Sequence, residues 1–230
     1  MIKNIRVKDM FIIVASLIVI SASALLTLSS SAFGISLTSD TKIVWHLIRS
    51  SGIVAYLLLT ASVIWGLVIS GKFAKEWSPG VISMTVHSTI SWLAVILSLI
   101  HAVLLLFDDY FTYTLGDIFI PFTGEYRPMF VGLGTLAFWA ILLISLSLPF
   151  KKRMGHRNWK WVHYGSYIAF LMVSAHGIFS GTDGSLLGFQ ILVGFSVLVV
   201  VMLLGIRMGK SQASVSASAK ARKTHSLSAE

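Results

Sequence analysis

Six long apolar stretches are the feature that most constrains how this chain can fold. A helix crosses the roughly 30 Å hydrocarbon core of a bilayer in about 20 residues, whereas strands of a membrane barrel would be shorter and would alternate in polarity. The stretches have helical length and lie at about 9–30, 46–70, 81–107, 128–149, 161–181 and 185–207. The sequence therefore predicts an all-α membrane protein, a bundle of six transmembrane helices.

The composition agrees with this class. Of the 230 residues, 56% are hydrophobic and only 12% are charged, which excludes a soluble globular domain. The chain contains no cysteine. It therefore has no disulfide, no iron–sulfur cluster bound through thiolates and no covalently attached c-type haem.

The distribution of charge predicts the orientation of the bundle. If the N-terminus is cytoplasmic, the inner connections hold 15 of the 18 basic residues: Lys3, Arg6, Lys8, Lys72, Lys75, Lys151, Lys152, Arg153, Arg157, Lys160, Arg207, Lys210, Lys220, Arg222 and Lys223. The outer connections hold six of the nine acids: Asp40, Asp108, Asp109, Asp117, Glu125 and Asp183. By the positive-inside rule, we expect a multi-pass protein of the cell membrane with both its N- and C-termini cytoplasmic. Because topology accounts for the net charge of +9, we expect no nucleic-acid partner.

The first apolar stretch and the C-terminal tail each need a separate interpretation. The first stretch follows a basic start and precedes "SSSAFG", so a cleaved signal peptide is the alternative to a retained helix. Its apolar run is long for a signal peptide, and we expect the helix to be retained. The tail from about Gly209 is rich in Ser, Ala and Lys, and we expect it to be disordered.

Four histidines stand out within the apolar stretches. His87 and His101 are fourteen positions apart in the third stretch, and His163 and His176 are thirteen apart in the fifth. On a helix these spacings cover about 21 and 19.5 Å. Both stretches run from inside to outside, so His87 and His163 lie near the inner end and His101 and His176 near the outer end. Two pairs at two depths result, and each pair can place a nitrogen on either side of one metal centre.

Haem iron commonly takes axial histidine, and a bundle core can hold such a cofactor. Each histidine taken singly has an alternative role as a packed residue bonded to a carbonyl. For the set, the alternative is a haem-free transition-metal transporter or channel, which would usually also recruit acids or methionine. The third and fifth stretches contain no acid. We assign no site to the remaining histidines, which are His46, His156 and His225.

Two glycines and one arginine accompany the histidines. Gly52 and Gly66 in the second stretch are fourteen apart and would let a flat macrocycle approach the helix; the alternative is ordinary packing of small residues. Arg49 lies near the outer end of the same stretch. Its guanidinium can bind a haem propionate, and the alternative is snorkelling to outer headgroups.

The chain resembles the ferric-reductase-like transmembrane domain shared by ferric reductases, NADPH oxidases and the haem subunit of periplasmic methionine-sulfoxide reductase. The resemblance rests on "WKWVHYGSY" followed by "SAHG", on the His87/His101 spacing, on "WHLIRSSGIVAYLLL" and on "IPFTGEYRPMFVGLGTLAFW". It covers about 45–207. The expected division is an N-terminal helix with an outer loop at 1–44, the haem-binding domain at 45–208 and a cytoplasmic tail at 209–230.

The resemblance implies two b-type haems, the inner one ligated by His87 and His163 and the outer one by His101 and His176. It implies electron transfer from a cytoplasmic donor to an outer acceptor, which can be a ferric chelate or a redox partner. Classical ferric reductases and NADPH oxidases continue into FAD and NADPH domains, and no nucleotide-binding motif such as GxxxxGK[ST] occurs here. We therefore expect the flavin on a partner, with a flavoprotein, a ferredoxin or a quinol as donor. The stand-alone bacterial members are the closer analogue, and the chain is expected to be an electron-transfer subunit of an oxidoreductase.

Overall fold

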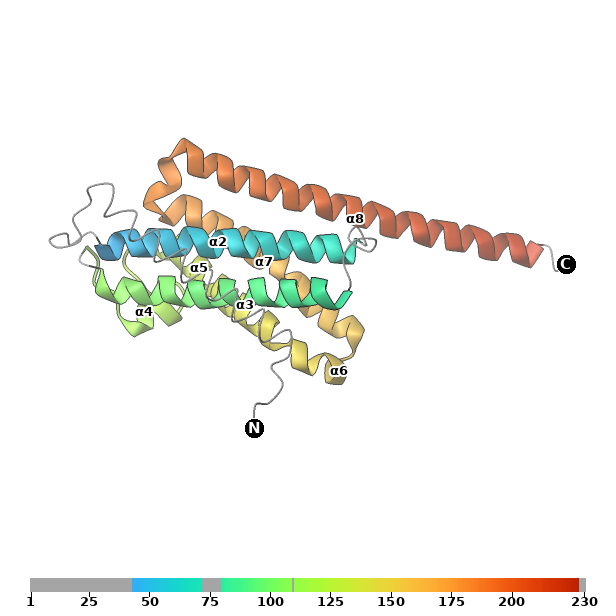
Figure 1. Ribbon diagram of the computed structural model, residues 1–230, viewed down its shortest axis with the longest axis horizontal. Coiled ribbons are helices and arrows are strands. Elements are labelled where there is room, and N and C mark those ends of the chain that lie inside the picture. Colours follow the sequence, from blue (N-terminus) through green and yellow to red (C-terminus); the bar gives the residue numbers. More distant parts are fainter. Residues whose placement is uncertain (1–42, 72–79, 109, 228–230) are drawn as a thin grey trace.

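The computed structural model describes residues 43–71, 80–108 and 110–227, with side chains placed as far as residue 209. Within these ranges the secondary structure is entirely helical (Figure 1). The long helices are α2 (Ile43–Ser70), α3 (Gly80–Leu104), α5 (Pro128–Leu146), α7 (His156–Ser180) and α8 (Leu187–Leu227). Short ones join them: η1 (Leu105–Phe107), α4 (Leu115–Phe119), η2 (Leu148–Phe150), α6 (Lys151–Met154) and η3 (Thr182–Ser185).

Four of the described helices are long and apolar enough to cross a membrane. They are Ile43–Ser70, Gly80–Phe107, Pro128–Leu146 and Leu187–Gly209. They coincide with four of the six expected stretches, which confirms an all-α, multi-pass membrane protein. Helix α7 is long enough, but its first half, "HRNWKWVHYGSY", is polar and aromatic. The expected first span at 9–30 lies outside the described residues, so the count of six and the cytoplasmic termini stay predictions.

Local sequence sets where several helices begin. Helix α5 starts at Pro128, whose fixed φ suits the first position of a helix. The residue before it, Arg127, has a left-handed backbone with φ 41°. Gly155 separates α6 from α7. Its φ of 78° is a backbone conformation that glycine adopts without a steric penalty.

The helices pack into one bundle. Helix α2 packs along α3, α5 packs along α7, and α8 lies against α2; α5 and α7 run obliquely behind the first pair (Figure 1). The centre of the bundle is aromatic. Phe170 is fully buried, and its ring stacks on that of Tyr56 at 6.0 Å between centroids. The Tyr56 hydroxyl also lies 3.3 Å from the Ser174 hydroxyl, which ties α2 to α7.

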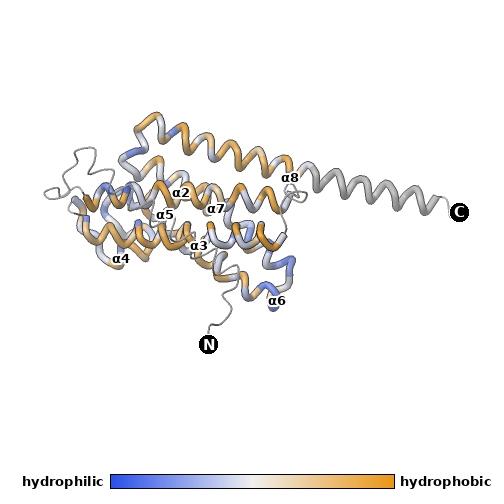
Figure 2. Tube along the Cα trace, in the orientation of Figure 1, coloured by the Kyte–Doolittle hydropathy of each residue, from blue (hydrophilic) through white to orange (hydrophobic). Residues whose placement is uncertain are grey.

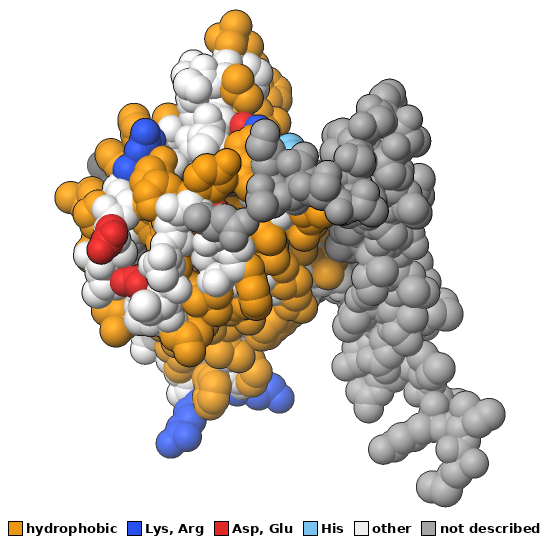
Figure 3. Space-filling model, turned by 90° about the vertical axis from the view of Figure 1, so that its left-hand side faces the viewer, with side chains coloured by type: hydrophobic (Ala, Val, Ile, Leu, Met, Phe, Trp, Pro, Cys, Tyr) orange, Lys and Arg blue, Asp and Glu red, His pale blue; other side chains and the backbone are white. Residues whose placement is uncertain are grey.

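The outside of the bundle is as apolar as a lipid-facing surface requires. Hydrophobic residues run along α2, α3, α5 and the coloured part of α8 (Figure 2). Large apolar side chains such as Leu143 and Phe195 are more than half exposed. Figure 3 looks at one end of the bundle, where acidic side chains are exposed above flanks of apolar residues. This pattern fits helices immersed in a bilayer, with water at the ends.

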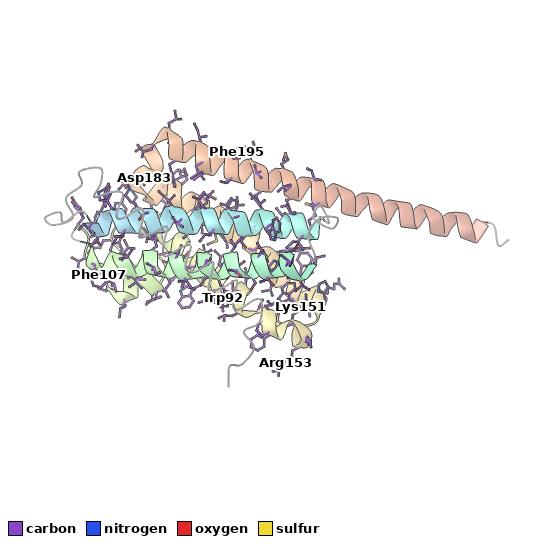
Figure 4. The ribbon with its side chains drawn as sticks, viewed as in Figure 1. Trp92, Phe107, Lys151, Arg153, Asp183 and Phe195 are labelled. Carbon is purple, nitrogen blue, oxygen red and sulfur yellow. The ribbon has the colours of Figure 1, made fainter. Side chains whose placement is uncertain are left out.

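Charges are separated between the two ends. Lys151 and Arg153 lie at one end and Asp183 at the other (Figure 4). The acidic end carries the connection from α3 to α5, in which Thr114 caps α4: the Asp117 backbone N–H donates to the Thr114 hydroxyl oxygen at 3.3 Å, and the Asp117 carboxylate accepts from the Thr114 N–H at 2.9 Å. We refer to the ends as outer (acidic) and inner (basic).

One difference from the sequence expectation concerns the C-terminal segment. Helix α8 continues to Leu227, through the stretch from Gly209 that we expected to be disordered. The segment "KSQASVSASAKARKTHSL" has no proline or glycine and contains several Ala, Lys and Arg residues. Because these are good helix formers and adding residues to an existing helix is easier than nucleating a new one, the composition allows α8 to extend.

Candidate functional site

The two outer histidines lie on different helices, and their rings lie close together. His101 comes from α3 and His176 from α7, and their ring centroids are 6.2 Å apart with an interplanar angle of 82°. The Nδ1 atoms lie 2.8 Å from the Ile48 carbonyl and 2.9 Å from the Phe130 carbonyl. Since a carbonyl oxygen only accepts, each Nδ1 carries the hydrogen and donates it. Each Nε2 is thereby left with a free lone pair, the form of imidazole that binds metals.

A glycine backs each ring of the outer pair. A Cβ added to Gly52 would lie 2.9 Å from Cε1 and Nδ1 of His101, and a Cβ added to Gly134 would lie 2.7 Å from Nδ1 of His176. Both distances are shorter than normal packing permits. We expected Gly52 to make room for a macrocycle; in the structure the group that lies directly against it is the His101 ring.

The inner pair has the same spacing. The rings of His87, on α3, and His163, on α7, have centroids 6.0 Å apart and an interplanar angle of 73°. The Ser62 hydroxyl lies 3.4 Å from His87 Nδ1 and 2.6 Å from the Ser91 hydroxyl. A Cβ added to Gly66 would lie 3.2 Å from His87 Cε1, which is tight but less severe than at the outer level.

An aromatic stack holds His163. The indole of Trp159 lies nearly parallel to its ring, at 5.0 Å and 18°. Trp159 is itself buried, and its Nε1 donates to the Ser147 hydroxyl at 3.1 Å. The Lys151 ammonium lies 4.4 Å from the indole centroid on the way to the inner surface, a cation–π contact. The inner pair is thus oriented by side chains, where the outer pair is oriented by backbone carbonyls.

The ring separations fit two histidines on either side of one metal. A transition-metal ion binds an imidazole nitrogen at about 2.0–2.1 Å, so two rings on opposite sides of one ion have centroids roughly 6 Å apart, as both pairs do. No group of three or more histidine, cysteine or acidic residues gathers in the part of the chain that the structure describes. A two-histidine set suits a metal whose remaining ligands come from a macrocycle.

The comparison with known families places the chain in a family. The ferric reductase-like transmembrane component family matches residues 51–174, which is more than half of the 230 residues. This chain belongs to that family. The match includes His87, His101 and His163 and stops two residues before His176. Neither the curated proteins nor the solved structures give a match.

In this ferric reductase-like chain the outer histidines border a cavity of about 450 Å³. Its wall is mostly apolar and aromatic and includes Gly52, His101, Gly134 and His176. The connection between α3 and α5 forms part of its wall. This connection is fastened by the Trp139 indole N–H, which donates to the Phe119 carbonyl at 2.9 Å.

Two titratable groups of the outer connection, Tyr113 and Asp117, have shifted pKa values. Burial, reinforced by the carboxylates of Asp108 and Asp117, raises the pKa of Tyr113 to about 12, so its phenol stays neutral. Hydrogen bonds from Thr114 lower the pKa of the Asp117 carboxyl, which stays ionised. The Tyr113 side chain therefore lines the cavity as a neutral phenol.

Arg49 has a partner that the sequence analysis did not foresee. Its guanidinium makes two hydrogen bonds to the Asp183 carboxylate, one of them from Nε at 2.8 Å, and it lies 4.1 Å from the centroid of the Trp45 ring. We expected Arg49 to bind a propionate because its charge lay near the membrane edge; in the structure that charge is paired with Asp183. Arg49 and Asp183 nevertheless both line the cavity beside the outer histidines.

Sequence reasoning missed four residues of the site: Gly134, Ser62, Trp159 and Asp183. The "GLG" of α5 offered a signal for Gly134, since small residues in a span can mark a close approach. Trp159 lies four residues before His163 and so shares its helix face.

Two other described histidines lie outside the site. His46 meets Trp45 edge-on at 4.8 Å and is exposed, and His156 stacks on Trp159 at 6.2 Å. Neither of these histidines joins a pair.

Proposed function

We propose that this protein is a transmembrane b-type cytochrome that passes electrons through two stacked bis-histidine haems, from a cytoplasmic donor to an outer acceptor. His87 and His163 would hold the inner haem b, and His101 and His176 the outer one. The observation that carries the proposal is the geometry of the outer pair: two facing rings at metal-bridging distance, each with its Nδ1 hydrogen committed to a backbone carbonyl. A packed histidine without a ligand would have no need of a partner ring at this spacing.

The chain's own residues orient the histidine rings and make room for them beside neighbouring helices. Hydrogen bonds from Nδ1 fix the ring orientation and raise the basicity of a ligating histidine. Gly52, Gly66 and Gly134 let the rings lie close to neighbouring helices. The two histidines of each pair would hold the haem, and bound haem would supply one-electron chemistry. The protein therefore needs no acid–base residue at either pair.

An aromatic side chain is buried between the two levels. Phe170 lies midway along α7 between His163 and His176 and is fully buried. On an ideal helix the two levels are separated by about 20 Å. The buried Phe170 ring, stacked on Tyr56, fills the bundle interior between these levels.

The same proposal includes the partners and the topology. Six spans with cytoplasmic termini would put the basic end and the inner pair on the donor side. Because no nucleotide-binding motif occurs in the sequence, the flavin belongs on a partner, and the donor is a flavoprotein, a ferredoxin or a quinol. The outer acceptor is a ferric chelate or a redox partner, and the lipid bilayer surrounds the bundle.

Reconstitution tests this function. The purified protein is placed in liposomes of defined orientation, and haem reduction is followed by stopped-flow absorbance. NADPH alone should give no reduction, whereas NADPH with a flavin reductase on the inner side should reduce the inner level first. His163→Ala should abolish this fast phase, and Trp92→Phe on the exposed face of α3 serves as the control. Rapid reduction by NADPH in a flavoprotein-free preparation would contradict the assignment of the flavin to a partner.

A further inference from the structure

A second arginine, at the inner end of the bundle, is paired differently from Arg49. Arg207 on α8 donates from Nη2 to the Tyr164 hydroxyl at 2.8 Å and from Nη1 to the Tyr167 hydroxyl at 3.0 Å. Both tyrosines belong to α7. Arg49 at the outer end is neutralised by a carboxylate, but within the described ranges no carboxylate pairs with Arg207. Its charge is held in place by neutral groups only.

A second cation lies beside the same tyrosines. The Lys160 ammonium is 5.7 Å from the centroid of the Tyr164 ring, and the Arg207 guanidinium is 5.1 Å from it on its own side. The rings of Tyr164 and Tyr167 are stacked at 6.0 Å. Each phenol oxygen accepts from Arg207 and keeps its own hydrogen to donate. The cluster therefore presents two positive charges and several free donors, which is the chemistry of an anion site.

The position of the cluster says which anion can reach it. Trp161 packs edge-on against Tyr164 at 5.8 Å and is 68% exposed. Tryptophan and tyrosine gather at the headgroup level of membranes, so this side of α7 faces lipid at the membrane–water boundary. Basic pockets between helices at this level suit the phosphates of anionic lipids.

We propose that Arg207, Lys160, Tyr164 and Tyr167 form a binding site for the phosphate headgroup of an anionic phospholipid, between α7 and α8 at the inner end. The lipid phosphate accepts hydrogen bonds from the guanidinium and the two phenols, and Lys160 adds a second positive charge. An anionic lipid is favoured over a zwitterionic one because the latter brings its own cation to a site that already holds two. The proposal does not depend on the haem assignment.

Native mass spectrometry of the purified full chain tests the proposal, with phosphatidylglycerol, phosphatidylcholine and inorganic phosphate titrated in separate arms. Wild type should bind phosphatidylglycerol more tightly than phosphatidylcholine. Arg207→Gln should weaken phosphatidylglycerol binding about five-fold and leave phosphatidylcholine binding unchanged. The double change Tyr164→Phe with Tyr167→Phe keeps the charge and removes the hydroxyls, and it should weaken the same lipid by a smaller factor.

The matched control is Arg153→Gln, which removes an equal charge from an exposed residue of the inner end outside the cluster. It should bind both lipids as wild type does. Equal losses in Arg207→Gln and Arg153→Gln would mean that overall charge, not this cluster, attracts the lipid, and would overturn the proposal. Unchanged phosphatidylglycerol binding in Arg207→Gln would overturn it as well. Inorganic phosphate that displaced the lipid at equal concentration would identify a free-phosphate site instead.

Discussion

The two histidine pairs have nearly equal ring separations, 6.2 Å outside and 6.0 Å inside, yet the protein orients them by different means. Backbone carbonyls hold both outer rings through Nδ1, and glycine backs each of them. The inner rings depend on side chains, namely the Ser62 hydroxyl and the Trp159 indole. A backbone carbonyl cannot be substituted, so the outer level should be sensitive to added bulk and the inner level to lost side chains.

The largest effects should come from the histidines themselves. His101→Ala or His176→Ala should remove the outer haem, and His87→Ala or His163→Ala the inner one, because each substitution deletes an axial ligand. Pyridine haemochrome assays should find about half of the wild-type haem in each variant. His46→Ala is the control and should keep all of it. Unchanged haem in all four ligand variants would remove the basis for the assignment.

The next largest effects should come from adding a methyl group at a glycine, and they should differ between the outer and inner levels. Gly134→Ala places a methyl group where the His176 ring lies, and overpacking of this kind costs about 1–3 kcal/mol. We expect a lower thermal midpoint and loss of the outer haem. Gly66→Ala, with more room, should cost less and affect the inner haem only.

Gly194 on α8 provides the control for both glycine substitutions, since nothing lies within 4 Å of an added Cβ. Gly194→Ala should be neutral, or should stabilise the helix by roughly 0.5–1 kcal/mol. If Gly134→Ala and Gly194→Ala behaved alike in thermal unfolding, the close approach of His176 to α5 would be wrong.

Loss of a side chain should act on the inner level alone. Trp159→Leu removes the stack on His163 and the hydrogen bond to Ser147, so the His163 ring gains rotational freedom. We expect the inner haem to be retained with an altered low-spin signal in electron paramagnetic resonance, and the outer signal to stay as in wild type. Trp92→Leu, on the outward face of α3 (Figure 4), should alter neither. A change in the outer signal would show that the two levels are not independent.

The smallest effects should come from the outer ion pair. Arg49→Gln leaves the Asp183 carboxylate unpaired beside the outer pair, and the added negative charge should lower the outer reduction potential. Asp183→Asn should raise it, each by tens of millivolts, about the size expected for one charge at this range. The double variant should return close to wild type in a redox titration. A double variant that matched Arg49→Gln would instead mean that Arg49 acts without Asp183, as a propionate ligand would require.

The histidine pairs could be predicted because spacing along a helix sets the depth of each residue in the membrane. Pairing required only that two histidines lie at equal depth. Their facing partners could also be predicted in part, since parallel spans bring equal depths together. The angle could not: thirteen residues fall about 140° short of whole turns, yet α7 is a continuous helix from His156 to Ser180 and both of its histidines meet α3. The oblique course of α7 (Figure 1) is a tertiary feature that a helical wheel does not contain.

Residues that act across helices were the ones missed. Gly134 and Trp159 matter because of the rings that pack against them. The "GLG" of α5 and the four-residue spacing of Trp159 from His163 are sequence signals, but the "GLG" does not identify the ring that packs there. Asp183 lies in η3 between α7 and α8, and the sequence placed it only among the outer acids. It meets Arg49 only when the chain folds back over 134 positions. The extension of α8 beyond Gly209 was missed because the polar composition of this segment favoured disorder. The helix propensity of its Ala, Lys and Arg residues favours the helix that the structure shows.

The most direct test of the two-level account is the haem content of the purified wild-type chain, measured by pyridine haemochrome against protein mass, together with its visible spectrum. Two bis-histidine sites predict about two haem b per chain, with the Soret and α bands of low-spin iron. One haem per chain would contradict a second site, and a well-folded colourless protein would contradict both.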